Sequence, residues 1–232
     1  MTDTTTPPAA LCERTLATIT ATLALEVVDD LALTSPMAPD PVGRLRVLRG
    51  GPIDKLVAVD LVVDPIGLDS HMLFAFTEPD SAVPHFTLDS VHAEYYAMHL
   101  DLIPRVDLGV HLQYLDAAFL PLTGLLEQAW QIDGVSAAAI GPRQRAMMSP
   151  WMVVCRATEE AFTALGDTVD GYLTHWLSLV DKGVPPVRSD TAMRDRINRA
   201  RLFSPEVDPV WAQVTRLLGP EQGERVRGEL IA

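Results

Sequence analysis

Hydrophobic and polar residues alternate along residues 86–91, near the middle of the chain. The period of two predicts a β-strand with one apolar face and with His85, Thr87 and Asp89 on the opposite face. A second strand over residues 94–102 follows after a short turn. A polar face of this kind either meets water, as in many antiparallel sheets, or forms the floor of a pocket. The pattern alone leaves both interpretations open.

Three more strands are predicted before this pair. Residues 44–48 alternate basic with apolar side chains, which is typical of an exposed edge strand. Residues 55–63 are apolar apart from Asp60 and a leading lysine, and residues 71–77 form the next strand. Because the connections between these strands are short, antiparallel hairpins are favoured over crossover connections.

Helical periodicity appears on both sides of the strands. Apolar residues spaced by three and four predict a helix over residues 11–33, after a disordered tail over residues 1–10. A second helix is predicted over residues 112–130, and Pro121 inside it implies a kink or a break. Residues 131–148 are rich in glycine, alanine and methionine and are predicted to form a loop.

The C-terminal third returns to one strand and then to helices. Residues 151–156 read as a strand, and Thr158 with the two glutamates after it predicts the start of a helix that runs to residue 180. Three shorter helices are expected at residues 189–202, 206–218 and 220–230. Strands in the middle with helices at both ends predict an α/β fold, a three-layer α/β/α sandwich with a central antiparallel sheet flanked by helices. One domain over residues 11–232 accounts for the pattern.

Composition narrows the class of protein further. Of the 232 residues, 48% are hydrophobic and 21% are charged, which is typical of a globular domain. The net charge of −13 disfavours nucleic acid and anionic membranes as partners. There is no apolar run of about 18 residues and no basic leader segment, so we expect a cytoplasmic protein. Cys12 and Cys155 are expected to be buried free thiols.

Motifs for bound cofactors are absent from the sequence. It contains no G-x-G-x-x-G, Walker, G-x-S-x-G, H-E-x-x-H or C-x-x-C motif. His85, His92 and His99 recur every seven residues, but that interval alternates faces on a strand and a turn intervenes. We therefore predict neither a metal site nor a bound organic cofactor.

The segment that begins at Glu78 reads EPDSAVPHFTLDSVHAEYYAMHLDLIPRVDLGVHLQYLDAAF and holds three short motifs in order. They are an E-P dipeptide, a P-x-F-x-x-D strand motif that ends at Asp89, and a D-L-x-P motif that closes the next strand. In these motifs the chain resembles the ferredoxin-dependent bilin reductases and red chlorophyll catabolite reductase, which share one fold. The continuation PRVDLGVHLQYL is most similar to the chlorophyll-catabolite branch. The resemblance is strongest over residues 55–160.

The resemblance implies an acidic site. Asp89 matches the residue that donates a proton to a bound open-chain tetrapyrrole, and Asp208 resembles the acid that faces it, although Asp before Pro is also typical of a helix start. Asp60 falls where one branch has a second acid, and the alternative for this residue is a buried ion pair. Met72 occupies the position of a functional histidine, and His71 beside it points to the other face.

Further residues complete the predicted substrate site. His85 and Thr87 share the polar strand face with Asp89. Three arginines are predicted to hold the propionates of a tetrapyrrole by bidentate hydrogen bonds, and these are Arg143, Arg145 and Arg156.

The resemblance also implies an activity, the radical reduction of a linear tetrapyrrole (a bilin or a chlorophyll catabolite) with single electrons from reduced ferredoxin. A proton must follow each electron, so the pKa of the donating acid has to rise well above about 4. Ferredoxin is itself acidic, so its docking requires a local basic patch, and residues 188–201 are the densest candidate. The alternative for these arginines is a solvated helix face. The alternatives are a non-catalytic tetrapyrrole-binding protein and a reductase of the same fold that acts on another substrate in secondary metabolism. Monomer and homodimer both remain open.

Overall fold

One sheet of eight strands forms the centre of the molecule. The computed structural model describes residues 5–232. The strands lie in the order β1-β2-β3-β4-β5-β6-β8-β7, and every neighbouring pair is antiparallel. They are β1 (Glu26–Leu33), β2 (Gly43–Gly50), β3 (Ile53–Val63), β4 (Leu68–Thr77), β5 (His85–His92), β6 (Tyr96–Ile103), β7 (Val135–Ala137) and β8 (Val153–Ala157).

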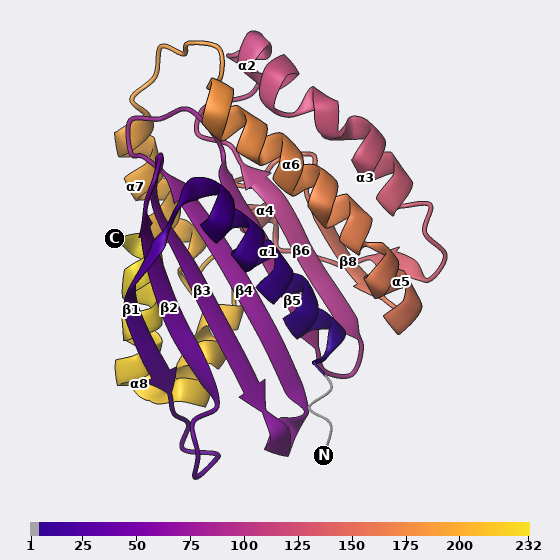
Figure 1. Ribbon diagram of the computed structural model, residues 1–232, viewed down its shortest axis with the longest axis vertical. Coiled ribbons are helices and arrows are strands. Elements are labelled where there is room, and N and C mark those ends of the chain that lie inside the picture. Colours follow the sequence, from indigo (N-terminus) through magenta and orange to yellow (C-terminus); the bar gives the residue numbers. More distant parts are fainter. Residues whose placement is uncertain (1–4) are drawn as a thin grey trace.

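Helices cover both faces of the sheet (Figure 1). The first face carries α1, α2, α3, α5 and α6, and the second face carries α4, α7 and α8. The helices are α1 (Pro7–Leu23), α2 (Leu112–Ala118), α3 (Thr123–Ala129), α4 (Pro142–Arg145), α5 (Glu159–Ala164), α6 (Gly166–Lys182), α7 (Thr191–Leu202) and α8 (Val210–Ile231), with 3-10 helices η1 (Asp64–Ile66) and η2 (Leu120–Leu122). The predicted three-layer α/β/α sandwich with a central antiparallel sheet is confirmed.

Each face of the sheet has its own apolar core. Successive strand residues point to opposite faces, so β4 gives Leu73 to the core under α1 and α6 but Phe74 to the core under α7 and α8. Likewise, β5 sends Phe86 and Leu88 to the first core. His85, Thr87 and Asp89 therefore face the second core, where the C-terminal helices cover them.

The predicted helix over residues 11–33 is wrong in its second half. α1 ends at Leu23, Ala24 takes a left-handed conformation with φ 53°, and β1 begins at Glu26. β1 pairs with β2 along its whole length, and its adjacent β-branched residues Val27 and Val28 suit a strand. The spacing of four between Val27 and Leu31 fits a helix or a strand. Pairing with β2 makes this segment a strand.

The predicted disordered tail is wrong for residues 7–10. α1 starts at Pro7, and the Thr6 hydroxyl caps it by accepting a hydrogen bond from the backbone N–H of Ala9. A proline at the first helical position fits there because its missing N–H would have no partner in the helix. Residues 1–4 of the predicted tail lie outside the described residues.

The strand predicted at the sheet edge is an interior strand. β2 lies between β1 and β3, and its basic residues meet acids on both neighbours. Arg44 pairs with Asp30 on β1, and Arg46 pairs with Asp60 on β3. Charged cross-strand pairs of this kind allow basic residues in an interior strand.

The C-terminal half contains the predicted helices and strand, but several of the predicted helices are divided into shorter ones. The long helix breaks at Pro121 as expected, leaving α2, η2 and α3. The segment predicted as a loop contains β7 and the short helix α4. Thr158 caps α5, which is followed by α6, and α6 ends at Gly183 with φ 77°. The last helix is interrupted at Gly219, just before Pro220.

Candidate active site

The polar residues of β5 and β6 form one continuous patch on the second face of the sheet. The register places Asp89 opposite His99 and Thr87 opposite Asp101. On the other side of β5, Met72 of β4 lies opposite Asp89. The alternation predicted for residues 86–91 is confirmed, and its polar face looks toward the C-terminal helices.

A cavity of about 80 Å³ lies between this patch and the C-terminal helices, and it opens to solvent. Its polar lining consists of Ser70, Asp89, His99, Gln144 and Asp208. Its apolar lining consists of Met72, Phe74, Val91, Met148, Leu202, Phe203, Val210 and Trp211. An apolar cavity with a few convergent polar groups is the usual form of a binding site for an organic ligand.

Asp89 is the acid at the floor of this cavity. Its side chain is 28% exposed, and among residues 5–232 its Oδ1 has no hydrogen-bond partner. Burial raises the pKa of Asp89 to about 7, and the nearby charge of Asp208 raises it in the same direction. The acid form of Asp89 is therefore well populated near neutral pH.

His99 does not stabilise the ionised form of Asp89. Its Nδ1 lies 4.0 Å from Asp89 Oδ2, which is too long for a hydrogen bond. Burial lowers the pKa of His99 to about 4, so the imidazole is neutral at physiological pH.

Asp208 lies on the opposite side of the cavity, just before α8. Its Oδ1 accepts a hydrogen bond from the backbone N–H of Val210, and its Oδ2 accepts one from Gln144 Nε2, both at 3.0 Å. Burial raises the pKa of Asp208. Asp208 therefore binds the first backbone N–H of α8 and also lines the cavity, while its role as an acid stays a prediction.

Asp60 is not part of this cavity, and its predicted place beside Asp89 is wrong. It lies on the face of β3 that α1 covers, where Arg46 Nη2 is 2.8 Å away and His71 Nδ1 is 3.0 Å away. His71 also bonds Asp69 through Nε2 at 2.7 Å. The sheet itself separates Asp60 from Asp89. The alternative interpretation, a buried ion pair, is the correct one.

The three predicted propionate ligands also lie outside the cavity lining. Arg156 is exposed and stacks on the ring of Tyr95, with Cζ 4.2 Å from the centroid. Arg143 donates to the backbone oxygen of Glu206, and Arg145 is exposed. The sequence places Arg143 and Arg145 on either side of Gln144, and only Gln144 points into the cavity.

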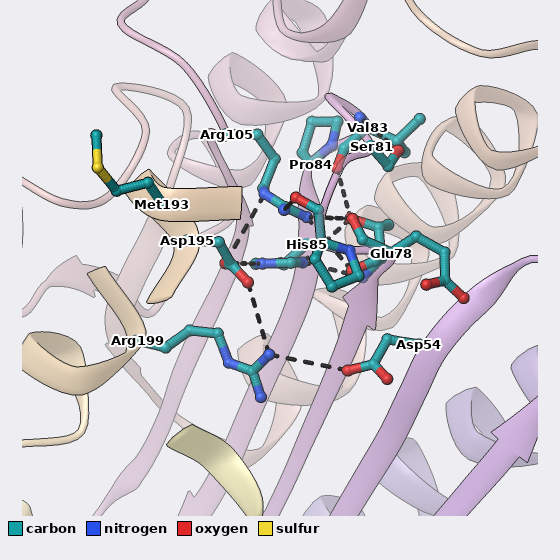
Figure 2. Close-up of polar contacts among 12 residues, drawn as sticks. Asp54, Glu78, Ser81, Val83, Pro84, His85, Arg105, Met193, Asp195 and Arg199 are labelled. Carbon is teal, nitrogen blue, oxygen red and sulfur yellow. Dashed lines mark hydrogen bonds and ion pairs between the residues drawn. The ribbon is translucent and has the colours of Figure 1, made fainter. Parts of the chain in front are cut away.

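His85 belongs to a separate buried cluster on the same face (Figure 2). Its Nε2 lies 2.6 Å from Asp195 of α7, and its Nδ1 accepts the backbone N–H of Thr77. Burial lowers the pKa of His85 to about 4, so the neutral ring donates to the Asp195 carboxylate. Arg199 flanks that carboxylate at 3.6 Å. Both ring nitrogens of His85 thus have partners within this cluster. His85 does not line the Asp89 cavity, so its predicted place in the substrate site is wrong.

A smaller enclosed cavity beside this cluster has room for about one water molecule. Leu202 lines both cavities. Thr87 lies between the two along β5 and is 1% exposed. Its hydroxyl has no hydrogen-bond partner within the described part of the chain. Thr87 therefore lies beside the Asp89 cavity, on the same face of the sheet, without lining it.

Sequence reasoning missed His99 and Gln144 as lining residues. In the second predicted strand, alternation puts His99 on the same face as Asp101, and this polar face was the one sign in the sequence that His99 could line a pocket. Gln144 gave none, since it lies in a segment predicted as a loop. Met72 lines the cavity, and its part in substrate binding stays a prediction.

No family model and no curated protein matches the sequence. Solved structures do match its fold. Phytochromobilin synthase from tomato, in a crystal structure with biliverdin, aligns with a TM-score of 0.68 at 18% sequence identity. The alignment covers 94% of this chain and 80% of that chain. The chain shares its fold with phytochromobilin synthase.

The fold shared with phytochromobilin synthase is the one that the motifs around Asp89 predicted. In this chain those motifs contact one another. Arg105, which follows the D-L-x-P motif, donates to the backbone oxygens of Glu78 and Pro79 in the E-P dipeptide. Within residues 5–232, no helix has the length and apolar character needed to cross a bilayer, and no cluster of metal-ligating side chains occurs there.

Proposed function

We propose that this chain binds a linear tetrapyrrole in the Asp89 cavity and reduces one of its double bonds. The observation that carries the proposal is the state of Asp89, a carboxyl with a pKa of about 7 at the floor of an apolar cavity. A general acid works best when its pKa lies near the working pH. The apolar wall, which includes Phe203 and Trp211, suits a planar conjugated ligand.

In the proposed reaction, two electrons and two protons convert one C=C bond of the ligand into CH–CH. Each electron that enters the conjugated system makes it more basic, and a proton then follows. Asp89 donates the first proton to the ligand and becomes a carboxylate. Solvent at the open part of the cavity then returns a proton to Asp89, which donates the second. Asp208 faces the same cavity, and its charge favours the acid form of Asp89.

Reduced ferredoxin is the proposed electron donor. The net charge of −13 repels an acidic partner, so docking depends on a local basic surface. Arg143 and Arg145 lie next to the cavity residue Gln144, and Arg201 is exposed at the end of α7. This arrangement offers positive charge close to the ligand, and the docking should therefore weaken as salt increases.

The test is an anaerobic reaction with biliverdin and reduced ferredoxin, followed by visible absorption. Wild-type protein should shift the ligand spectrum on binding and then change it further with ferredoxin. Asp89→Asn should bind biliverdin within about twofold of wild type and lose at least about a hundredfold in turnover, the usual scale for a missing general acid.

The control is Asp116→Asn, which changes an exposed carboxyl on α2, a helix that packs on the first face. It should match wild type in both binding and turnover. A spectral shift on binding with no further change after ferredoxin would show a tetrapyrrole-binding protein without reductase activity. No binding of biliverdin, or wild-type turnover in Asp89→Asn, would contradict the proposal.

A further inference from the structure

His99 is a cavity residue for which neither the motifs nor the comparisons suggest a role. It lies on β6 directly opposite Asp89, and its side chain is 13% exposed. Its Nε2 is buried, and no other atom in residues 5–232 forms a hydrogen bond with it. A buried polar atom in this state costs the protein free energy unless a ligand or water satisfies it.

The unsatisfied atoms near His99 form a group. Asp89 Oδ1 and Thr87 Oγ1 share this property within the described residues. The three side chains come from neighbouring positions of β5 and β6, on the face that the C-terminal helices cover. By contrast, Asp101 in the same patch accepts hydrogen bonds from both the backbone N–H and the hydroxyl of Ser149. Within the patch, Asp89 and His99 therefore bring unsatisfied polar atoms to the cavity lining, and Thr87 lies beside them.

The protonation states of Asp89 and His99 determine which hydrogen bonds the His99 imidazole can form with a ligand. A neutral imidazole has one N–H donor and one acceptor nitrogen. Nδ1 faces the Asp89 carboxyl at 4.0 Å, beyond hydrogen-bond distance, and Nε2 is the buried nitrogen without a partner in residues 5–232. We place the imidazole proton on Nε2, where a ligand acceptor would satisfy it. His99 presents an N–H donor, and the matching ligand group is an acceptor such as a carbonyl oxygen.

We propose that His99 is a positioning residue that donates a hydrogen bond from Nε2 to a carbonyl oxygen on an end ring of the bound ligand. The inference rests on the proposed function. His99 transfers no proton and no electron. Its hydrogen bond holds the ring of that carbonyl over β5 and β6, within reach of Asp89, and stabilises the negative charge that develops on the oxygen when an electron enters. The double bond reduced is therefore one conjugated with this carbonyl.

The chemistry of the site specifies the class of ligand. It requires a planar conjugated molecule with a terminal amide-type carbonyl, because a neutral N–H donor discriminates strongly against an analogue without an acceptor there. The floor carries no cation that would hold a carboxylate, since His99 and Asp89 are both mostly uncharged between about pH 4 and about pH 7. Acidic side groups of the ligand thus lie away from the floor.

Three substitutions test the role of each nitrogen. His99→Gln keeps an amide N–H close to the position of Nε2, His99→Asn keeps one close to Nδ1, and His99→Leu removes both while filling most of the space. His111→Gln is the matched control, because His111 precedes α2 and makes no capping hydrogen bond with its side chain. Thermal unfolding of each variant verifies that it is folded.

The first readout is an anaerobic titration of biliverdin without reductant. We expect about tenfold weaker binding and a displaced long-wavelength band for His99→Leu, with both restored toward wild type in His99→Gln and less so in His99→Asn. The second readout is single-turnover reduction of the bound ligand, which should slow in the same order. A merely structural role would change stability without moving the absorption band of the ligand.

The outcomes separate this inference from the proposed function. If wild-type protein binds no biliverdin, both are wrong. If wild type binds and reduces biliverdin but His99→Leu has the same affinity and the same absorption band, only the role of His99 is contradicted. Equal performance of the Asn and Gln variants would also contradict it, because it would show that Nε2 has no particular role. If His99→Leu does not fold, the comparison of Gln with Asn still decides the question.

Discussion

Asp89 and His99 lie opposite each other on β5 and β6 and are both mostly neutral between about pH 4 and about pH 7. Their nearest atoms, Oδ2 and Nδ1, are 4.0 Å apart. Burial raises the pKa of Asp89 to about 7 and lowers the pKa of His99 to about 4. Asp89 is ionised only above the upper value, and His99 is charged only below the lower one. Between them the pair is neutral, which is the state that a proton donor beside a conjugated ligand requires.

Replacing Asp89 should change how stability depends on pH. The folded state binds the Asp89 proton more tightly than the unfolded state, so this group favours folding most below about pH 4, and that contribution is lost as the pH rises through about 7. Asp89→Asn lacks the effect. Its free energy of unfolding relative to wild type should therefore increase by roughly 3 kcal/mol between about pH 5 and about pH 8.

Urea unfolding at several pH values measures this difference. Asp116→Asn, which removes an exposed carboxyl, should show the same pH dependence as wild type. A stability difference for Asp89→Asn that stays constant over the range would mean that the pKa of Asp89 is ordinary.

The network around His71 makes a second prediction, on the first face of the sheet. Burial alone would lower the pKa of His71, but hydrogen bonds to Asp60 and Asp69 outweigh burial and raise it. The charged imidazole thus lies between two carboxylates. Its contribution to stability is fully present below about pH 6.5, the ordinary pKa of histidine, and is lost as the pH rises through the raised value.

His71→Gln should therefore cost more stability at about pH 6 than at about pH 9, with a loss at the lower pH of roughly 3 kcal/mol, as expected when a buried ion pair loses one partner. Urea unfolding at the two pH values provides the measurement. His111→Gln should have little effect at either. An equal loss at both pH values would show that His71 is neutral in the folded protein.

Arg105 links the strand motifs and makes a third prediction. It is 2% exposed and donates to the Thr77 hydroxyl at 2.6 Å and to the backbone oxygens of Glu78 and Pro79. Arg105→Lys keeps the charge but loses the planar fork that reaches several acceptors. We expect a loss of about 3 kcal/mol in unfolding free energy. The exposed substitution Arg145→Lys should cost less than about 0.5 kcal/mol. An equally small loss for Arg105→Lys would show that the hydrogen bonds from Arg105 to Glu78 and Pro79 do not stabilise the fold.

The strands and the polar face around Asp89 were predictable because their signals are local. Alternation along β5 decides which side chains share a face, whatever the rest of the fold does. The raised pKa of Asp89 also follows from a simple rule, that an acid in an apolar setting resists ionisation. Its partner Asp208 came from the family resemblance, since 119 residues separate the two in sequence.

The errors come from information that a sequence pattern does not contain. β3 is apolar on both faces, so alternation could not show whether Asp60 shares a face with the Asp89 cavity. The three arginines had charge but no strand register or cavity geometry to place their side chains. Residues 26–33 satisfied a helical spacing by chance, and only the pairing with β2 makes them a strand.

The most direct test of the account is the pKa of Asp89 itself in the ligand-free protein. Infrared difference spectra between wild type and Asp89→Asn, recorded from about pH 4 to about pH 9, report the C=O band of this one protonated carboxyl. The account predicts that the band persists at pH 6 and titrates away near pH 7. A band that has already disappeared at pH 5 would show an ordinary, ionised aspartate and would contradict the proposed role of Asp89 as a proton donor.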